Sequence, residues 1–197
     1  NELEKIFRSA VNKTLNSITI DGDTSTNDTA IILSPDTGRY LNSTESLAAF
    51  TGALEAVLMK LAEMLVLDGE GATKSVKIHV INAATDDDAM LIARAVGQSL
   101  LVKTAFFGND PNWGRIACAA GYSGAALEEE KLSISIDNIP LLTNGVPKNA
   151  DYSQLEVILK KRNYTVTVDM GLGDGDAIML TTDISYDYVK INAQYST

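Results

Sequence analysis

The spacing of apolar and polar residues along the chain predicts a mixture of long helices and short strands. Apolar positions between Leu3 and Leu15 recur every three or four residues, as on one face of a helix. The segment from Ser46 to Leu67 carries a longer apolar stripe of the same period. Further helices are predicted from Thr85, as the N-cap, to about Gln98, and over residues 112–120 and 152–161.

Short apolar runs bounded by Gly, Pro, Asn or Asp predict the strands. The predicted strands cover residues 17–20, 30–33, 76–81, 100–107, 132–136, 139–142, 164–169 and 177–182. Because strands and long helices are interspersed, we expect an α/β fold with layered sheet and helices. No internal repeat and no linker rich in Pro or Ser divides the chain, so we expect residues 1–197 to have no internal domain boundary.

The chain is acidic, which excludes some partners. Its 197 residues contain 16 Lys plus Arg and 26 Asp plus Glu, giving a formal net charge of −10. Such a chain is a poor match for the phosphate backbone of nucleic acid or for an anionic membrane surface. There is no run of about 20 apolar residues and no signal peptide at Asn1, so we expect a cytoplasmic protein.

Cysteine and histidine each occur once, as Cys118 and His79. One cysteine excludes an intrachain disulfide and a multi-cysteine zinc site, and one histidine leaves the usual histidine-based metal clusters without ligands. We therefore expect no metal site and no resident cofactor. Cys118 is interpreted as a packed thiol and His79 as a structural residue of a strand.

Two local patterns suggest binding loops but have simpler interpretations. The glycines of GLGDG, residues 171–175, resemble half of a dinucleotide fingerprint, yet the segment lies between two predicted strands and its aspartates would repel a pyrophosphate. A tight connection between paired strands is the better interpretation. Asp21, Asp23, Ser25 and Asn27 mimic the first ligands of a calcium loop, but Thr26 stands where glycine is required, so a hydrogen-bonded turn is favoured.

Four longer stretches, read together, resemble a known family. They are ITIDGDTSTND at 18–28, DGEGATK at 68–74, LVKTAFFGNDPNWGRI at 101–116 and DYVKINAQYST at 187–197. In this order they resemble the β chain of the ornithine acetyltransferase family, also called glutamate N-acetyltransferase, the bifunctional arginine biosynthesis proteins. The resemblance runs essentially from end to end and implies an amino-terminal-nucleophile type of fold that a separate α chain completes.

The resemblance implies a specific chemistry. Family members are made as a precursor that cuts itself into α and β chains, which form an α2β2 heterotetramer. The threonine that begins β accepts acetyl from N-acetylornithine and passes it to glutamate, and some members also use acetyl-CoA as the donor. Its free amine, with an ordinary pKa of about 8, takes the proton of the threonine hydroxyl.

Three residues of this chain match substrate-binding positions of the family. The resemblance assigns Glu70 of the DGEG segment to substrate binding, where a carboxylate suits the ammonium group of an amino acid. Asn192 and Thr197 match the substrate-contacting residues of the terminal motif. From the residues alone, Glu70 reads as a solvated helix-end residue and Thr197 as part of a frayed tail.

The sequence has no counterpart of the catalytic threonine, which the resemblance places upstream of Asn1. Thr14, Thr19 and Thr24 are internal and have no free amine, so no residue of this chain is assigned as the nucleophile. Two alternatives to the acetyltransferase stay open: a related amidohydrolase or aminopeptidase that passes the acyl group to water, and a catalytically silent binding subunit.

Overall fold

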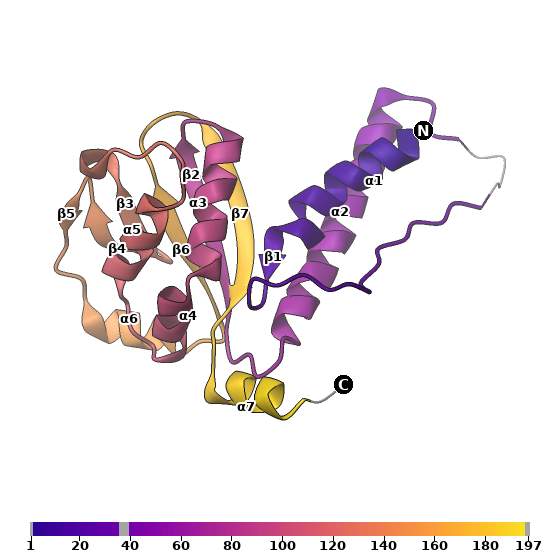
Figure 1. Ribbon diagram of the computed structural model, residues 1–197. Helices are drawn as coiled ribbons and strands as arrows, with labels where there is room; N and C mark the ends of the chain where they lie inside the picture. Colours follow the sequence, from indigo (N-terminus) through magenta and orange to yellow (C-terminus); the bar gives the residue numbers. More distant parts are fainter. Residues whose placement is uncertain (1, 36–39, 196–197) are drawn as a thin grey trace.

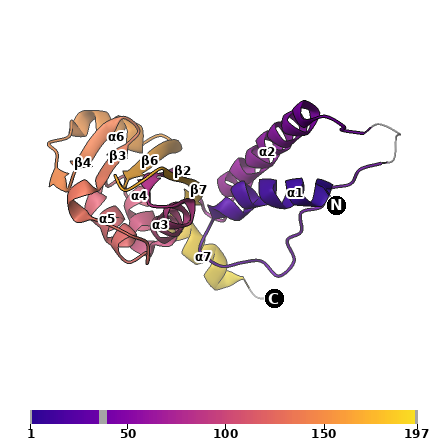
Figure 2. The same cartoon turned by 90° about the horizontal axis from the view of Figure 1, so that it is seen from above.

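The computed structural model describes residues 2–35 and 40–195. These residues form one mixed sheet with helices on one face and a projecting pair of helices (Figures 1 and 2). The helices are α1 (Glu2–Lys13), η1 (Leu15–Ser17), α2 (Thr44–Leu67), α3 (Asp86–Gln98), α4 (Leu100–Phe107), α5 (Trp113–Gly121), η2 (Glu129–Lys131), α6 (Tyr152–Leu159) and α7 (Tyr186–Gln194). The strands are β1 (Ile18–Thr19), β2 (Ser75–Ala83), β3 (Ser133–Ile136), β4 (Ile139–Thr143), β5 (Val146–Pro147), β6 (Asn163–Asp169) and β7 (Gly175–Thr182).

The sheet is built around β2. Its seven strands follow the order β1-β7-β2-β6-β3-β4-β5. β2 runs parallel to β6 and antiparallel to β7, and the short β1 runs parallel to β7 at the edge. The expected layered α/β fold is therefore confirmed, with a mixed rather than a parallel sheet.

One face of the sheet carries the core. Val76, Ile78 and Val80 of β2 alternate with more exposed residues and are fully buried, as the period of a half-covered strand requires. They pack in one cluster with apolar side chains of α3, α4, α5 and α6. In Figures 1 and 2, α3, α4 and α5 lie together on this face.

Helices α1 and α2 project away from the sheet as a pair (Figure 2). Ser43 and Ser46 form a capping box at the start of α2, which satisfies backbone N–H groups that the first turn leaves unpaired. Three residues of this 24-residue helix are buried, Leu58, Ala62 and Val66. A helix that is apolar on several faces is normally covered by other elements, so α2 leaves an unusual apolar surface.

Residues 100–107 form helix α4, and the strand expected there is wrong. The run is apolar and short, a pattern that periodicity cannot assign to strand or helix. The Ser99 hydroxyl accepts a hydrogen bond from the backbone N–H of Val102 and so caps a helix. The turn of α4 carries Lys103 into the interior, where its side chain is fully buried.

The expected strand over residues 30–33 is also wrong. This part of the chain has no regular secondary structure, and Ile31 and Leu33 are 72% and 85% exposed. The neighbouring edge strand β1 has two residues and pairs with β7. The segment therefore lacks a strand partner and a core to pack against.

The glycine-rich segment 171–175 does not join paired strands as expected. β6 and β7 each pair with β2, which lies between them. The connection crosses the end of β2, where the backbone N–H groups of Leu172 and Gly173 donate to the carbonyl oxygen of Asn82. No helix follows the segment, so the dinucleotide fingerprint lacks its required context.

Among the described residues, no single helix is both long and apolar enough to cross a membrane. The consecutive helices α3 and α4 meet that test only when taken together, and they bend by 58° at their junction.

Gly175→Ala is expected to destabilise the protein by about 2 kcal/mol or more. A Cβ atom at this position would lie 2.3 Å from the Thr85 carbonyl oxygen. Chemical denaturation measures the effect. Gly121→Ala is the matched control, because a Cβ there meets no atom within 4 Å; equal losses in the two variants would contradict the steric explanation.

The buried Lys103 is expected to make stability depend on alkaline pH. Burial lowers the pKa of Lys103 to about 8, although Asp183 and Asp21 oppose the shift. Between pH 8 and 10 the unfolded chain keeps a proton that the folded chain releases, so the free energy of unfolding rises with pH. Relative to Lys103→Met, the wild-type value should rise by about 1 kcal/mol per pH unit in this range.

Denaturation of the two proteins at pH 8, 9 and 10 measures this difference. Lys148→Met removes an exposed lysine and should follow the wild-type pH dependence. A Lys103→Met protein with that same dependence would show that Lys103 does not titrate in this range.

Candidate functional site

Three chain segments meet beyond the end of β7. The Thr182 hydroxyl donates to the carbonyl oxygen of Ile20, just after β1, at 3.0 Å. The Ser185 hydroxyl donates to the carbonyl oxygen of Gly71, in the turn after α2, at 2.6 Å. Helix α7 then begins with Ser185 as its N-cap. The residues after β1, the turn after α2 and the start of α7 are therefore held together at one end of the sheet.

This junction places Glu70 beside Asn192. The side-chain amide of Asn192 donates to the Glu70 carboxylate at 2.7 Å, and also to the backbone carbonyl of Tyr188 at 3.1 Å. The two residues lie 122 positions apart in the chain, and both are exposed to solvent. The third residue expected from the sequence, Thr197, lies outside the described residues, as does Asn1.

The turn that carries Glu70 depends on glycine. Gly71 has φ of +63°, and a Cβ atom there would lie 2.4 Å from the backbone nitrogen of Tyr188. A side chain at this position would force α7 away from the turn. The second glycine of the DGEG segment is thus required because α7, the helix that carries Asn192, approaches it closely.

The surroundings of Glu70 are acidic. The Tyr188 hydroxyl donates to the Asp21 carboxylate at 2.9 Å. Burial raises the pKa of Tyr188 to about 12, and the charges of Asp21, Asp23 and Glu70 add to the shift. Tyr188 therefore keeps its proton at neutral pH and acts as a donor. The gathered carboxylates favour a cationic ligand such as an ammonium group.

Sequence reasoning missed the buried polar residues behind this surface. Asp183 is 2% exposed and accepts hydrogen bonds from the backbone N–H groups of Thr73 and Lys74, at 2.8 and 2.9 Å, and from the Thr73 hydroxyl. Lys103 donates to the Thr182 carbonyl and to the hydroxyls of Thr181 and Thr182. Nothing in the local pattern marks Asp183, and Lys103 lies in a run that the sequence predicts as a strand.

The other sequence candidates are a turn, a histidine of a strand and a single cysteine. The backbone N–H of Asp23 donates to the Asp21 side chain, which confirms a hydrogen-bonded turn. His79 lies in β2 as expected, 2.7 Å from the Asp176 carboxylate. Cys118 is exposed on α5 and is not a packed thiol, because Ile116, Ala119 and Ala120 form the buried side of that helix. Within residues 2–35 and 40–195 no group of three or more His, Cys, Asp or Glu could hold a metal ion.

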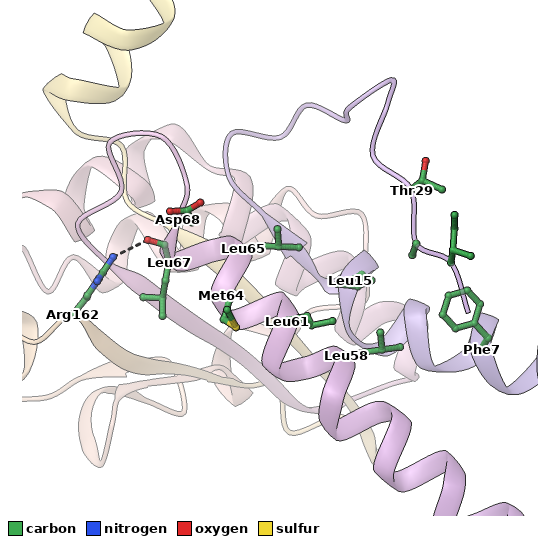
Figure 3. A pocket seen from close by; sticks show the side chains of 12 residues that line it. Phe7, Leu15, Thr29, Leu58, Leu61, Met64, Leu65, Leu67, Asp68 and Arg162 are labelled. Carbon is green, nitrogen blue, oxygen red and sulfur yellow. Dashed lines mark hydrogen bonds between the residues drawn. The ribbon is translucent and has the colours of Figure 1, made fainter. Parts of the chain in front are cut away.

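An apolar groove of about 850 Å³ runs along α2. Figure 3 shows Leu61 and Leu65 of α2 lining it, with Phe7 of α1 on the far side and Thr29 on the loop that passes over it. At its other end the groove reaches Leu67 and Asp68, directly before the turn that carries Glu70. The groove and the acidic site are therefore adjacent, although Glu70 and Asn192 do not line the groove.

Comparison with known proteins identifies relatives over nearly the whole chain. The chain is 48% identical over 99% of its length to the arginine biosynthesis bifunctional protein ArgJ of Geobacter sulfurreducens, covering 51% of that protein. It is 45% identical to the mitochondrial ArgJ of Schizosaccharomyces pombe and 42% identical to a glutamate N-acetyltransferase of Methanosarcina acetivorans. The chain spans about half the length of these relatives.

A crystal structure of ArgJ from Bacillus halodurans has the same fold. The match has a TM-score of 0.94 and 36% sequence identity, and it covers 98% of this chain and 93% of the solved one. The solved chain thus has nearly the length of the present one. A family model described as the ArgJ family matches residues 1–197. The chain therefore belongs to the ArgJ family.

Proposed function

We propose that this chain is the β chain of a glutamate N-acetyltransferase of arginine biosynthesis, which moves acetyl from N-acetylornithine to glutamate. The observation that carries the proposal is the Glu70–Asn192 pair in an acidic surface. An amide and a carboxylate side by side can form hydrogen bonds with the polar groups of an amino acid, and the negative charge attracts its ammonium group. The names of the relatives support the reaction.

In the proposed reaction a threonine that begins the complete β chain is the nucleophile. Its hydroxyl oxygen bonds to the acetyl carbon of N-acetylornithine, the amide C–N bond breaks, and the hydroxyl proton passes through the free amine to the leaving nitrogen. The amine of glutamate then attacks the acetyl-threonine ester and regenerates the hydroxyl. Glu70, Asn192 and Thr197 bind the amino-acid substrates, and acetyl-CoA is a second candidate donor.

We propose that an α chain completes the site by docking along the groove of α2. The relatives are about twice as long as this chain, whereas the matched crystal chain has a similar length, which supports a protein made of two chains. Leu61, Met64 and Leu65 are 45–55% exposed on α2, and apolar surface of this kind favours a protein partner. Two such α–β pairs would form the expected α2β2 heterotetramer.

A cytoplasmic location stays a prediction. One of the relatives, from Schizosaccharomyces pombe, is named as a mitochondrial protein.

The acceptor of the acetyl group tests the proposed reaction. Incubating the complete protein with N-acetylornithine labelled in its acetyl group, together with glutamate, should give labelled N-acetylglutamate and a β chain one acetyl group heavier by mass spectrometry. Labelled acetate as the main product would instead assign an amidohydrolase. Absence of any labelled product would leave a silent binding subunit.

Glu70→Gln is expected to raise KM for N-acetylornithine by about tenfold or more, because it removes the charge that pairs with the substrate ammonium. Steady-state kinetics of the complete protein measures the change. The matched control is Glu130→Gln in η2, an exposed carboxylate outside the three segments of the site. Unchanged KM in Glu70→Gln would remove Glu70 from substrate binding.

Leu65→Glu is expected to weaken association with the α chain by about tenfold or more, since a charge would enter an apolar interface. Co-purification from cells that express both chains, followed by analytical ultracentrifugation, measures the change. Val157→Glu, on α6 and 64% exposed, is the control. Equal recovery of the α chain with both variants would exclude the groove as its docking surface.

A further inference from the structure

The Asp183 side chain is hydrogen-bonded to the chain that follows the Glu70 turn. Its carboxylate accepts from the backbone N–H groups of Thr73 and Lys74 and from the Thr73 hydroxyl. Hydrogen bonds to an ionised acceptor are about twice as strong as neutral ones. Because Asp183 is nearly fully buried, water cannot replace these partners, so the carboxylate holds residues 73–74 at one position.

The two residues before Asp183 are fixed in turn by Lys103. Its ammonium group donates to the hydroxyls of Thr181 and Thr182 at 2.9 and 3.1 Å and to the Thr182 carbonyl. The ammonium groups of Lys103 and Lys74 both interact electrostatically with Asp183. The buried carboxylate therefore has positive charges nearby. Lys103 of α4 also fixes the end of β7 through these hydrogen bonds.

The two residues after Asp183 carry the connection to α7. Ser185 donates to the carbonyl oxygen of Gly71 and caps α7 by accepting from the N–H of Tyr188. Residues 183–185 are thus hydrogen-bonded to the chain around Gly71 and Thr73. The same residues fix where the helix that carries Asn192 begins. The distance between Glu70 and Asn192 depends on both attachments.

We propose that Asp183 is a positioning residue for substrate binding: it clamps the turn that carries Glu70 against the start of the helix that carries Asn192. Asp183 acts through Glu70 and Asn192 and does not itself touch the substrate. The proposal rests on the proposed function in that the ligand of Glu70 is taken to be the ammonium group of an amino acid.

The test is a double-mutant cycle in the complete α–β protein. Asp183→Asn keeps the size of the side chain but turns an amide N–H₂ group or a single oxygen toward the donors of residues 73–74. It should raise KM for N-acetylornithine by about tenfold with a smaller change in kcat. When Asp183→Asn is combined with Glu70→Gln, KM should rise little beyond the value of Glu70→Gln alone. The carboxylate that Asp183 positions is already absent in that protein.

The control is Asp151→Asn. Asp151 also accepts backbone N–H groups, those of Ser153 and Gln154, but it caps α6 and lies outside the site. KM should be unchanged in this variant. A KM effect of Asp183→Asn that multiplies with that of Glu70→Gln, or one that Asp151→Asn reproduces, would overturn the proposal, since a merely structural role predicts either result.

Hydrogen–deuterium exchange provides a readout that does not need turnover. In Asp183→Asn the amides of Thr73 and Lys74 should exchange at least about tenfold faster, while those of β2 beyond them keep the wild-type rate. Unchanged exchange would overturn the clamp. If these amides exchange faster in Asp183→Asn but the wild-type protein transfers no acetyl group, the proposed function is refuted. The positioning role of Asp183 would still hold.

Thr73→Val is the second variant, in case Asp183→Asn does not fold. It removes the hydroxyl donor and leaves both backbone donors in place. A smaller rise in KM, again absent on the Glu70→Gln background, supports the proposal, and an unchanged KM counts against it.

Discussion

The buried polar groups at the end of β7 need hydrogen-bond partners. The segments that supply these partners are the ones that build the site. Thr181, Thr182 and Asp183 are each at most 2% exposed, and a buried polar group without a partner destabilises a protein by about 1–3 kcal/mol. Their partners come from α4, from the end of α3, from the residue after β1 and from the chain after the Glu70 turn. One buried junction therefore fixes the positions of four segments, each of which is far from the end of β7 in sequence.

The surface over this junction is acidic. The charges of Asp21, Asp23 and Glu70 act on the half-buried Tyr188, whose hydroxyl donates a hydrogen bond to Asp21. Glu70 and Asn192 remain exposed, so they are accessible to a ligand. The apolar groove of α2 ends at Asp68, beside the same turn. The acidic surface and the apolar groove therefore meet at the end of α2.

Much of the fold was predictable because it follows from local periodicity and capping. The Thr85 cap with three aspartates behind it, the long α2 and the β2 strand lie where the pattern predicts them. The errors have a common cause. Six of the eight residues 100–107 are apolar and the run is short, so its period does not distinguish strand from helix. The helix is decided by the Ser99 cap and by partners for Lys103. The strand order, in which β2 separates β6 from β7, depends on pairing between segments far apart.

By itself, the sequence determined most of the elements, the acidic charge and the motifs that relate this chain to its family, because these depend on neighbours along the chain. It also singled out Glu70 and Asn192, through the resemblance. Only the tertiary structure decided that these two side chains meet, that Gly71 is required by the approach of α7, and that Asp183 and Lys103 are buried behind them. Contacts across more than a hundred residues arise from packing and from satisfying buried polar groups, and no local pattern encodes them.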